Sequence, residues 1–236
     1  MELTVRDVAS LLGLPEQAVY RMAQSGQLPA YQVDSQTRFN NADLLDWVIA
    51  NKPEMALRVH SQLAGCVHGQ PQIVEALAAG GVFHGIAGSD RLAVIRAVAN
   101  LLPVPKTIDR ETVFQMMWTR EAEASTAIGD GIAIPHASYP IVFQIDRPIV
   151  TLCFLEHPVD FGAGDGKHVS TLFALVCPTA RQHLSMLAQL ASALGNEAFK
   201  GAVLEHAPRE RILSLLAAAI VSSTTAVPGE DKGIER

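Results

Sequence analysis

A single histidine, His136, follows a short apolar run in the segment STAIGDGIAIPHAS, residues 125–138. One ring nitrogen of a neutral imidazole carries a lone pair, and it is nucleophilic enough to accept a phosphoryl group. Pro135 has a fixed φ and no N–H, so we expect it to direct the chain out of a sheet and to present His136 at the surface. The segment alone is equally consistent with a covalent role for His136 and with a structural histidine at a strand end.

The same segment contains groups that could bind an anion beside the imidazole. Gly129 and Gly131 let the backbone approach another group closely, because glycine has no Cβ. Ser125 and Thr126 add hydroxyls and backbone amides. We therefore predict a small phosphate-binding cradle next to His136.

Predicted helices place two more polar residues. His183 lies early in a helix predicted over residues 179–194 and should point toward the sheet, since leucines follow it at helical spacing. Those leucines are Leu187, Leu190 and Leu194. Arg120 lies near the end of a helix that begins at Asp109, where its guanidinium could hold phosphate oxygens in two places. The alternatives are a core histidine at 183 and a solvated cation at 120.

Other catalytic frameworks are absent from the sequence. GAGDGK at residues 162–167 looks like a phosphate loop, but Phe161 and His168 stand where a Walker motif needs glycine and a hydroxyl residue, so we interpret it as a turn. No motif typical of zinc proteases, esterases or dinucleotide-binding proteins occurs. The cysteines are widely spaced and form no C-x-x-C pair: Cys66, Cys153 and Cys177. We therefore expect no metal, no cofactor and a reducing cytoplasm.

Length and composition indicate two globular domains. The chain has 236 residues, of which 49% are hydrophobic and 18% charged, too apolar a composition for disorder. The start, MELTVRDVAS, is polar, and no apolar run approaches the roughly 20 residues of a membrane helix, so we expect neither export nor membrane insertion. A net charge of -6 argues against nucleic-acid affinity over the whole surface, because phosphates bind clustered Lys and Arg.

Residues 1–52 are expected to form a small domain of three helices and one hairpin. Thr4 can cap the first helix, Gly13 can close it, and Pro15 can begin the second. The stretch LPAYQVDSQTRFN then predicts two strands, and ADLLDWVIAN a third helix. This order resembles the winged helix-turn-helix modules of the excisionase and MerR-like group, in which the second helix enters the major groove.

The charge of this first domain is unusual for a DNA reader. Four basic residues stand against six acidic ones, a balance of -2, whereas DNA-reading domains are usually basic. The resemblance implies that Arg21 on the second helix and Arg38 on the hairpin contact DNA phosphates. The alternative is a scaffold for protein contact or for a homodimer.

A larger domain is predicted over residues 71–222, after a linker or connecting helix over residues 53–70. Buried strands are expected over residues 148–155 and 169–178, and helices over residues 179–194 and 208–221. Helices that alternate with buried strands predict an α/β sandwich with a mixed sheet between helices. Residues 223–236 form a polar tail with no reason to order.

Four segments of the larger domain together resemble one known family. In chain order they are LAAGGVFHGIAGSDRLAVIRAVANLL, TREAEASTAIGDGIAIPHA, PVDFGAGDGKHVSTLFALVCP and QHLSMLAQLASAL. They closely resemble the fructose/mannitol class of enzyme IIA in the bacterial phosphoenolpyruvate phosphotransferase system, especially its nitrogen-regulatory branch. The resemblance implies that a phosphohistidine carrier of the HPr type phosphorylates His136, and that Arg120 and His183 surround the phosphate. The chain would then be a phosphoryl carrier rather than a metabolic enzyme with free turnover.

Three functions fit this combination of domains. The first is a cytoplasmic regulatory protein, phosphorylated on His136, that signals through protein or DNA contacts. The second is a sugar-specific enzyme IIA that passes the group to a IIB domain or permease. The third is a DNA-binding repressor whose IIA-like domain only senses or dimerises. The stretch ASYPIVFQIDRP after His136 departs from the nitrogen-regulatory pattern and predicts an altered rim for partner binding.

Overall fold

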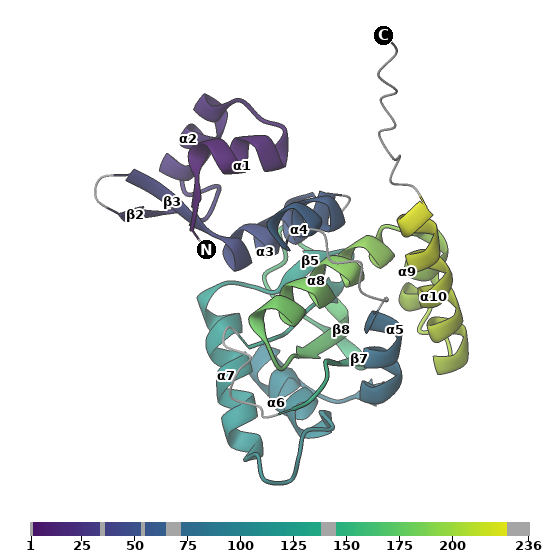
Figure 1. The fold of residues 1–236 in the computed structure, drawn as a ribbon. Helices are drawn as coiled ribbons and strands as arrows, with labels where there is room; N and C mark the ends of the chain where they lie inside the picture. Colours follow the sequence, from purple (N-terminus) through teal and green to yellow (C-terminus); the bar gives the residue numbers. More distant parts are fainter. Residues whose placement is uncertain (1, 34–35, 53–54, 65–71, 138–144, 226–236) are drawn as a thin grey trace.

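The computed structural model describes residues 2–33, 36–52, 55–64, 72–137 and 145–225. Within these ranges the chain forms a small N-terminal helix-turn-helix domain and a larger domain in which helices cover both faces of a mixed sheet (Figure 1). The predicted fold class is therefore confirmed. The predicted tail beyond residue 225 and most of the ASYPIVFQIDRP stretch lie outside the described residues.

The N-terminal domain has the predicted three helices and hairpin, with one short strand added in front. Its elements are β1 (Glu2–Thr4), α1 (Val5–Leu12), α2 (Glu16–Gln24), β2 (Tyr31–Val33), β3 (Gln36–Asn40) and α3 (Asn41–Asn51). Thr4 caps α1 as predicted: its hydroxyl accepts the N–H of Asp7, whose carboxylate accepts the N–H of Thr4 in return. Gly13 ends α1 with a φ of 66°, a left-handed conformation that glycine adopts without strain.

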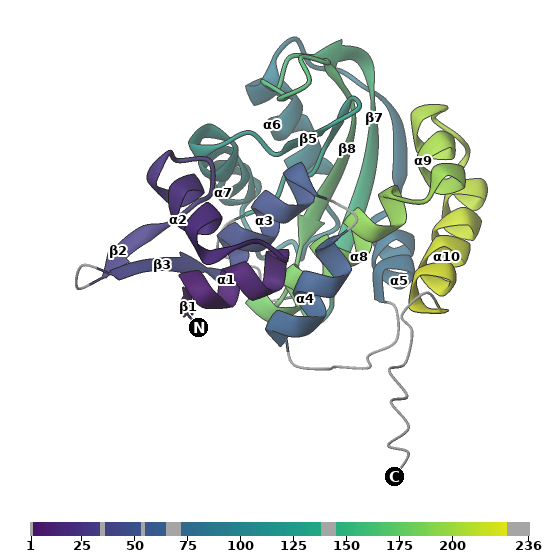
Figure 2. The ribbon, with the colours of Figure 1, turned by 90° about the horizontal axis from the view of Figure 1, so that it is seen from above.

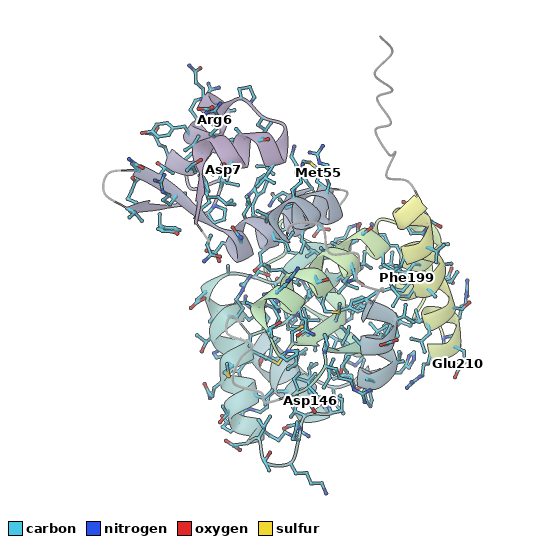
Figure 3. All side chains as sticks on the ribbon, in the orientation of Figure 1. Arg6, Asp7, Met55, Asp146, Phe199 and Glu210 are labelled. Atoms are coloured by element: carbon cyan, nitrogen blue, oxygen red, sulfur yellow. The ribbon has the colours of Figure 1, made fainter. Side chains whose placement is uncertain are left out.

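A further helix, α4 (Ala56–Ala64), joins the two domains. It packs against α3 on one side and against α8 (Ala180–Leu194) of the larger domain on the other. Met55, labelled in Figure 3, lies at the turn between α3 and α4. It packs against the apolar core that contains buried residues of α3, α4 and α8. In Figure 2, which looks down on the N-terminal domain, α3 and α4 lie over α8. The N-terminal domain is therefore packed onto the larger domain rather than separated from it.

The larger domain contains the remaining helices and strands. Besides α8 these are α5 (Gln72–Gly80), β4 (Val82–Ile86), α6 (Arg91–Leu101), α7 (Arg110–Glu123), β5 (Ala127–Gly129), β6 (Ile132–Ala133), β7 (Ile149–Val159), β8 (Val169–Val176), α9 (Glu197–Leu204) and α10 (Arg209–Thr225). The five strands form one sheet in the order β4-β7-β8-β6-β5. The sheet is mixed, because β4 with β7 and β6 with β8 are parallel, while β7 with β8 and β5 with β6 are antiparallel.

The two faces of the sheet contact different helices. Along β8, Leu172 and Ala174 belong to the core under α6 and α7, whereas Phe173 and Leu175 belong to the core shared with α5, α8, α9 and α10. This alternation is the period of two expected for a strand buried on both faces. The second of these cores also contains apolar residues of α3 and α4, so the N-terminal domain belongs to the α8 side of the sheet.

Candidate functional site

His136 lies just beyond β6, beside the central strand β8. The backbone carbonyl of Pro135 accepts the N–H of Leu175, and His136 forms a parallel bridge with Leu175. The prediction that Pro135 drives the chain out of the sheet is therefore wrong. Proline lacks only the N–H, so its carbonyl still pairs with the neighbouring strand.

Strand alternation aims the His136 side chain at α8. Ile132 and Ile134 face the core shared with α8, while Ala133 faces the core under α6 and α7. His136 follows Ile134 by two residues and so shares its face. Its ring centroid lies 4.9 Å from that of His183, in the first turn of α8. The predicted orientation of His183 toward the sheet is confirmed by its burial.

The backbone determines which ring nitrogen of His136 carries the proton. Nδ1 lies 2.7 Å from the carbonyl oxygen of Ile134. Since a carbonyl only accepts hydrogen bonds, Nδ1 carries the proton and donates it there. When the ring is neutral, Nε2 is thereby left with the lone pair, and it points away from the strand that holds the ring.

Arg120 extends from the last turn of α7 to the same place. One guanidinium nitrogen donates to the carbonyl of Ala124 at 2.8 Å, which fixes the side chain against its own helix end. The side chain lines the same cavity as His136, and only 13% of it is exposed. His136, His183 and Arg120 thus converge from a strand end and two helices, and their roles toward phosphate stay a prediction.

An aspartate of the N-terminal domain completes this cluster. Oδ2 of Asp46, on α3, accepts a hydrogen bond from Arg120 Nη2 at 2.8 Å and lies 3.4 Å from Nε2 of His136. The sequence reading did not include Asp46. Its separation of 74 residues from Arg120 leaves no local spacing that could have identified it.

His136 is buried, with 4% of the residue exposed. The expectation that it would lie at the surface is therefore wrong for this structure, because α3 lies over the ring. A cavity of about 30 Å³ remains beside it, lined among others by Asp46, Ile49, Arg120 and Leu187. A cavity of this size holds about one water molecule.

The cluster determines the charges of its members. Burial alone would raise the pKa of Asp46, but His136, where its ring carries a second proton, and Arg120 outweigh it and hold that pKa well below its usual range. Burial, assisted by His136 and Arg120, lowers the pKa of His183 to about 3, although Asp46 acts in the opposite direction. At neutral pH, Asp46 is therefore an anion and His183 is neutral, with one N–H to donate.

The predicted hydroxyl pair, Ser125 and Thr126, lines the same cavity. Both donors of Thr126, its N–H and its hydroxyl, bond to the buried carboxylate of Glu121. Ser125 uses its hydroxyl oxygen to accept the N–H of Ala127. Burial raises the pKa of Glu121, while Thr126 and Arg91 act against that shift. In this conformation Thr126 therefore offers no free donor to an anion.

The glycines of the expected anion cradle lie elsewhere. Gly129 and Gly131 have positive φ and flank Asp130 in the turn between β5 and β6. The N–H of Asp130 donates to the Asp165 carboxylate at 2.8 Å, and a Cβ at Gly129 would meet that same carboxylate. The prediction that these glycines form a cradle beside His136 is therefore wrong; they allow a tight turn to pack on the 160–168 loop. That loop contains the turn predicted for GAGDGK, closed by a bond from Gly166 to Ala163.

The predicted DNA-contacting residues lie apart from this cluster. Arg21 is exposed on α2, where it borders a hollow together with Tyr20 and Glu16. Arg38 is half-buried on β3 and donates to Gln36. In Figure 1, α2 lies on the side of the N-terminal domain that faces away from the larger domain, whereas the hairpin of β2 and β3 extends sideways from it.

Metal-binding clusters and membrane-spanning helices are both absent from the described ranges. No group of three or more His, Cys, Asp or Glu side chains in these ranges is arranged to hold a metal ion. In the same part of the chain, no helix has both the length and the apolar character needed to cross a bilayer.

Comparisons with known proteins give consistent results for both domains. Residues 75–219 match the family described as "Phosphoenolpyruvate-dependent sugar phosphotransferase system, EIIA 2", and residues 2–52 match a helix-turn-helix domain. A nitrogen regulatory protein of Pseudomonas aeruginosa is 37% identical over 113 residues, which are 46% of this chain and 71% of that protein. A phosphotransferase-system fructose-specific EIIA component of Haloferax volcanii is 32% identical over 114 residues, 48% of this chain and 72% of that protein.

A solved structure also resembles the larger domain. The nitrogen regulatory protein IIA-Ntr from Neisseria meningitidis superposes with a TM-score of 0.53 and 25% sequence identity. The match covers 61% of this chain and 98% of that one.

Proposed function

Because the chain belongs to the EIIA type 2 family of the phosphoenolpyruvate-dependent sugar phosphotransferase system, we propose that His136 is its phosphoryl acceptor. The donor is a phosphohistidine protein of the HPr type in the cytoplasm, and the acceptor atom is Nε2. One observation carries the proposal: Nδ1 is tied to the Ile134 carbonyl, which leaves Nε2 for transfer, in a ring that lies 4.9 Å from the His183 ring and lines the same cavity as Arg120.

Transfer to Nε2 needs no proton to leave His136. The Nε2 lone pair forms the new N–P bond, and the electron pair of the old N–P bond stays on the imidazole nitrogen of the donor. Both rings keep the proton on their other nitrogen, and for His136 the Ile134 carbonyl holds that proton in place. The requirement on the protein is therefore an in-line approach and stabilisation of the transferred charge.

Arg120 and His183 supply that stabilisation. The guanidinium is held at one end by Ala124, so its other nitrogen is oriented before any phosphate arrives. His183 is neutral, because burial lowers its pKa to about 3, and it can donate one hydrogen bond to a phosphoryl oxygen. A fixed cation and a fixed neutral donor suit a group whose oxygens share the negative charge.

The helix-turn-helix domain favours a regulatory use of the phosphoryl group. A protein that only passes phosphate to a permease has no evident need for such a domain, whereas a regulator needs a part that contacts DNA or a target protein. The relative in Pseudomonas aeruginosa is called a nitrogen regulatory protein, which agrees with this use. Arg21 and Arg38 are the residues we assign to DNA phosphates, should the target be DNA.

The test is phosphorylation with purified components. The chain is incubated with phosphoenolpyruvate labelled with ³²P, enzyme I and an HPr-type carrier, and the label is followed on acid and base treatment. The wild type is expected to take up acid-labile, base-stable label, and His136→Ala to take up none. His157→Ala, which changes an exposed histidine of β7, is the matched control and should label normally. An unlabelled wild type, or a labelled His136→Ala variant, would refute the proposal.

Sugar transport is the second candidate, because the Haloferax volcanii relative is a fructose-specific EIIA component. It predicts that phosphorylated protein loses its label to a purified IIB domain within seconds to minutes. Regulation predicts that the label persists in the presence of IIB and that phosphorylation changes binding to DNA or to a target protein.

A further inference from the structure

The contact between Asp46 and the histidine site crosses from one domain to the other. Asp46 is on α3 of the N-terminal domain, whereas Arg120 and His136 belong to the larger domain. Its Oδ2 atom contacts both the cation and the Nε2 atom that we assign to phosphoryl transfer. An anionic oxygen therefore occupies the position where an oxygen of a phosphoryl group on Nε2 would have to lie.

We propose that Asp46 is a built-in occupant of the phosphoryl site, so that the N-terminal domain packs on the larger domain only while His136 is unphosphorylated. This inference rests on the proposed function of His136. It adds that phosphorylation has a structural consequence within the same chain, the release of α3 and its helix-turn-helix domain.

Phosphorylation of His136 and the packed position of Asp46 exclude each other, for reasons of both charge and space. A phosphoryl group on Nε2 would bring two negative charges into a site that already holds a carboxylate 3.4 Å away. Like charges that share a desolvated site repel strongly, and only one of the two anions can keep Arg120. The remaining cavity of about 30 Å³ has no room for a phosphoryl group beside Asp46. The carboxylate must therefore leave, and α3 moves with it.

The packed N-terminal domain also blocks the approach of the phosphoryl donor. A carrier protein must bring its own phosphohistidine in line with Nε2, yet α3 lies over His136 and leaves 4% of it exposed. The packed conformation is therefore unable to react, and the carrier reacts only with molecules in which α3 has moved away. The observed rate of phosphorylation then scales with the fraction of open molecules.

Apolar packing holds the rest of the interface. Leu45, Ile49 and Val59 of α3 and α4 belong to one buried cluster with Leu187 and Leu190 of α8. None of these contacts responds to charge, so they stabilise the packed state in general. Asp46 is the member of the interface that distinguishes an unmodified histidine from a phosphorylated one.

The experiment compares Asp46→Asn with Asp43→Asn in the full chain. Both variants remove one negative charge from α3, but the exposed Asp43 acts on Asp46 and Arg120 only through its charge and contacts neither Arg120 nor His136. Asp46→Asn is expected to accept label from the carrier at least tenfold faster than the wild type and to expose α8 to hydrogen exchange. Asp43→Asn should match the wild type in both measurements. Small-angle X-ray scattering should show a larger radius for the phosphorylated wild type than for the unphosphorylated protein.

The outcomes separate this inference from the proposed function. If the wild type takes up label but its scattering and its exchange in α8 are unchanged, the phosphoryl acceptor stands and the role of Asp46 is refuted. If the wild type takes up no label, the proposed function fails, and hydrogen exchange in Asp46→Asn still decides whether this contact holds the domains together. His136→Glu, which puts a carboxylate in front of Asp46, should open the structure without any carrier; a packed His136→Glu protein with a normal circular dichroism spectrum would overturn the inference.

Discussion

Two aspartates in this molecule each contact two basic side chains, but the two clusters hold together different parts of the structure. Asp130 contacts Lys167 at 2.5 Å and Lys200 at 2.6 Å, all within the larger domain. Asp46 contacts Arg120 and His136 and belongs to the other domain. The first cluster fixes a turn in which Asp130 has a φ of 51°, and the second fixes the packing of one domain on another.

The two clusters differ in how strongly water and salt screen their charges. The Asp130 side chain is 42% exposed and the Lys167 side chain 58%, so water and salt screen their attraction. The Asp46 side chain is 22% exposed, and its partners Arg120 and His136 are 13% and 5% exposed. A buried pair is expensive to break on one side only, because the remaining charge stays desolvated. The same arrangement of charges is therefore a minor support in one place and a strong constraint in the other.

Arg120→Ala should give the largest loss of stability. It leaves Asp46 without its closest cation, and we expect the free energy of unfolding to fall by about 3 kcal/mol, the lower end for breaking a buried pair because Asp46 keeps some contact with water. Urea unfolding followed by circular dichroism measures the loss. Lys200→Ala, which removes one cation from the exposed cluster, should cost less than about 1 kcal/mol.

A double variant tests whether the cost of Arg120→Ala comes from Asp46. Asp46→Asn in the Arg120→Ala background removes the unpaired charge, so the double variant should be more stable than Arg120→Ala alone. Equal stability of the double and single variants would mean that Arg120 acts through other contacts, such as its bond to the Ala124 carbonyl.

The pH dependence of stability should also distinguish the two regions. Burial, His136 and Arg120 lower the pKa of His183 from 6.5 to about 3, so below pH 6.5 the unfolded chain binds a proton that the folded chain refuses. Stability is therefore full above pH 6.5 and falls as the pH drops toward 3, by about 2 kcal/mol between pH 7 and pH 5. The bonds from Lys167 and Lys200 lower the pKa of Asp130 to about 2, so its contribution is lost only below pH 3.8.

His183→Gln is the variant that tests this pH response. It keeps a hydrogen-bond donor but cannot titrate, so urea unfolding at pH 7 and pH 5 should show a smaller difference than in the wild type. An unchanged difference would assign the pH response to another histidine, such as His206, whose pKa burial also lowers.

The sequence predicted the parts of the fold that depend on local patterns. The apolar runs of β7 and β8 and the leucine spacing of α8 indicate buried elements, and all three are present. The parallel edge strand β4 was not predicted, because VFHGI contains an exposed histidine and a glycine and lacks the alternation of a strand. Its stability comes from pairing with β7, which no local pattern records.

In the candidate site, too, some residues could be predicted from the sequence and one could not. His136 was singled out by its motif, and Arg120 and His183 by the resemblance to the enzyme IIA family; the fold brings the three to one place. The contact of Asp46 with this site could not be predicted, because Asp46 belongs to another domain and the sequence around it indicates only a helix. The only hint in the sequence was the surplus of acidic residues in the first 52 positions. This surplus argued against a domain that only reads DNA, and it agrees with an acidic residue that contacts another part of the same chain.

Asp130→Asn should have the smallest effect and thereby complete the comparison. Asparagine adopts a positive φ about as readily as aspartate, so the turn keeps its conformation and only the attraction to Lys167 and Lys200 is lost. Because the cluster is open to water, we expect a loss of about 0.5 kcal/mol that disappears in 1 M salt. Asp130→Ala should cost about 1 kcal/mol more, since alanine is strained at this φ. If Asp130→Asn proved as costly as Arg120→Ala, burial would not be what separates the two clusters.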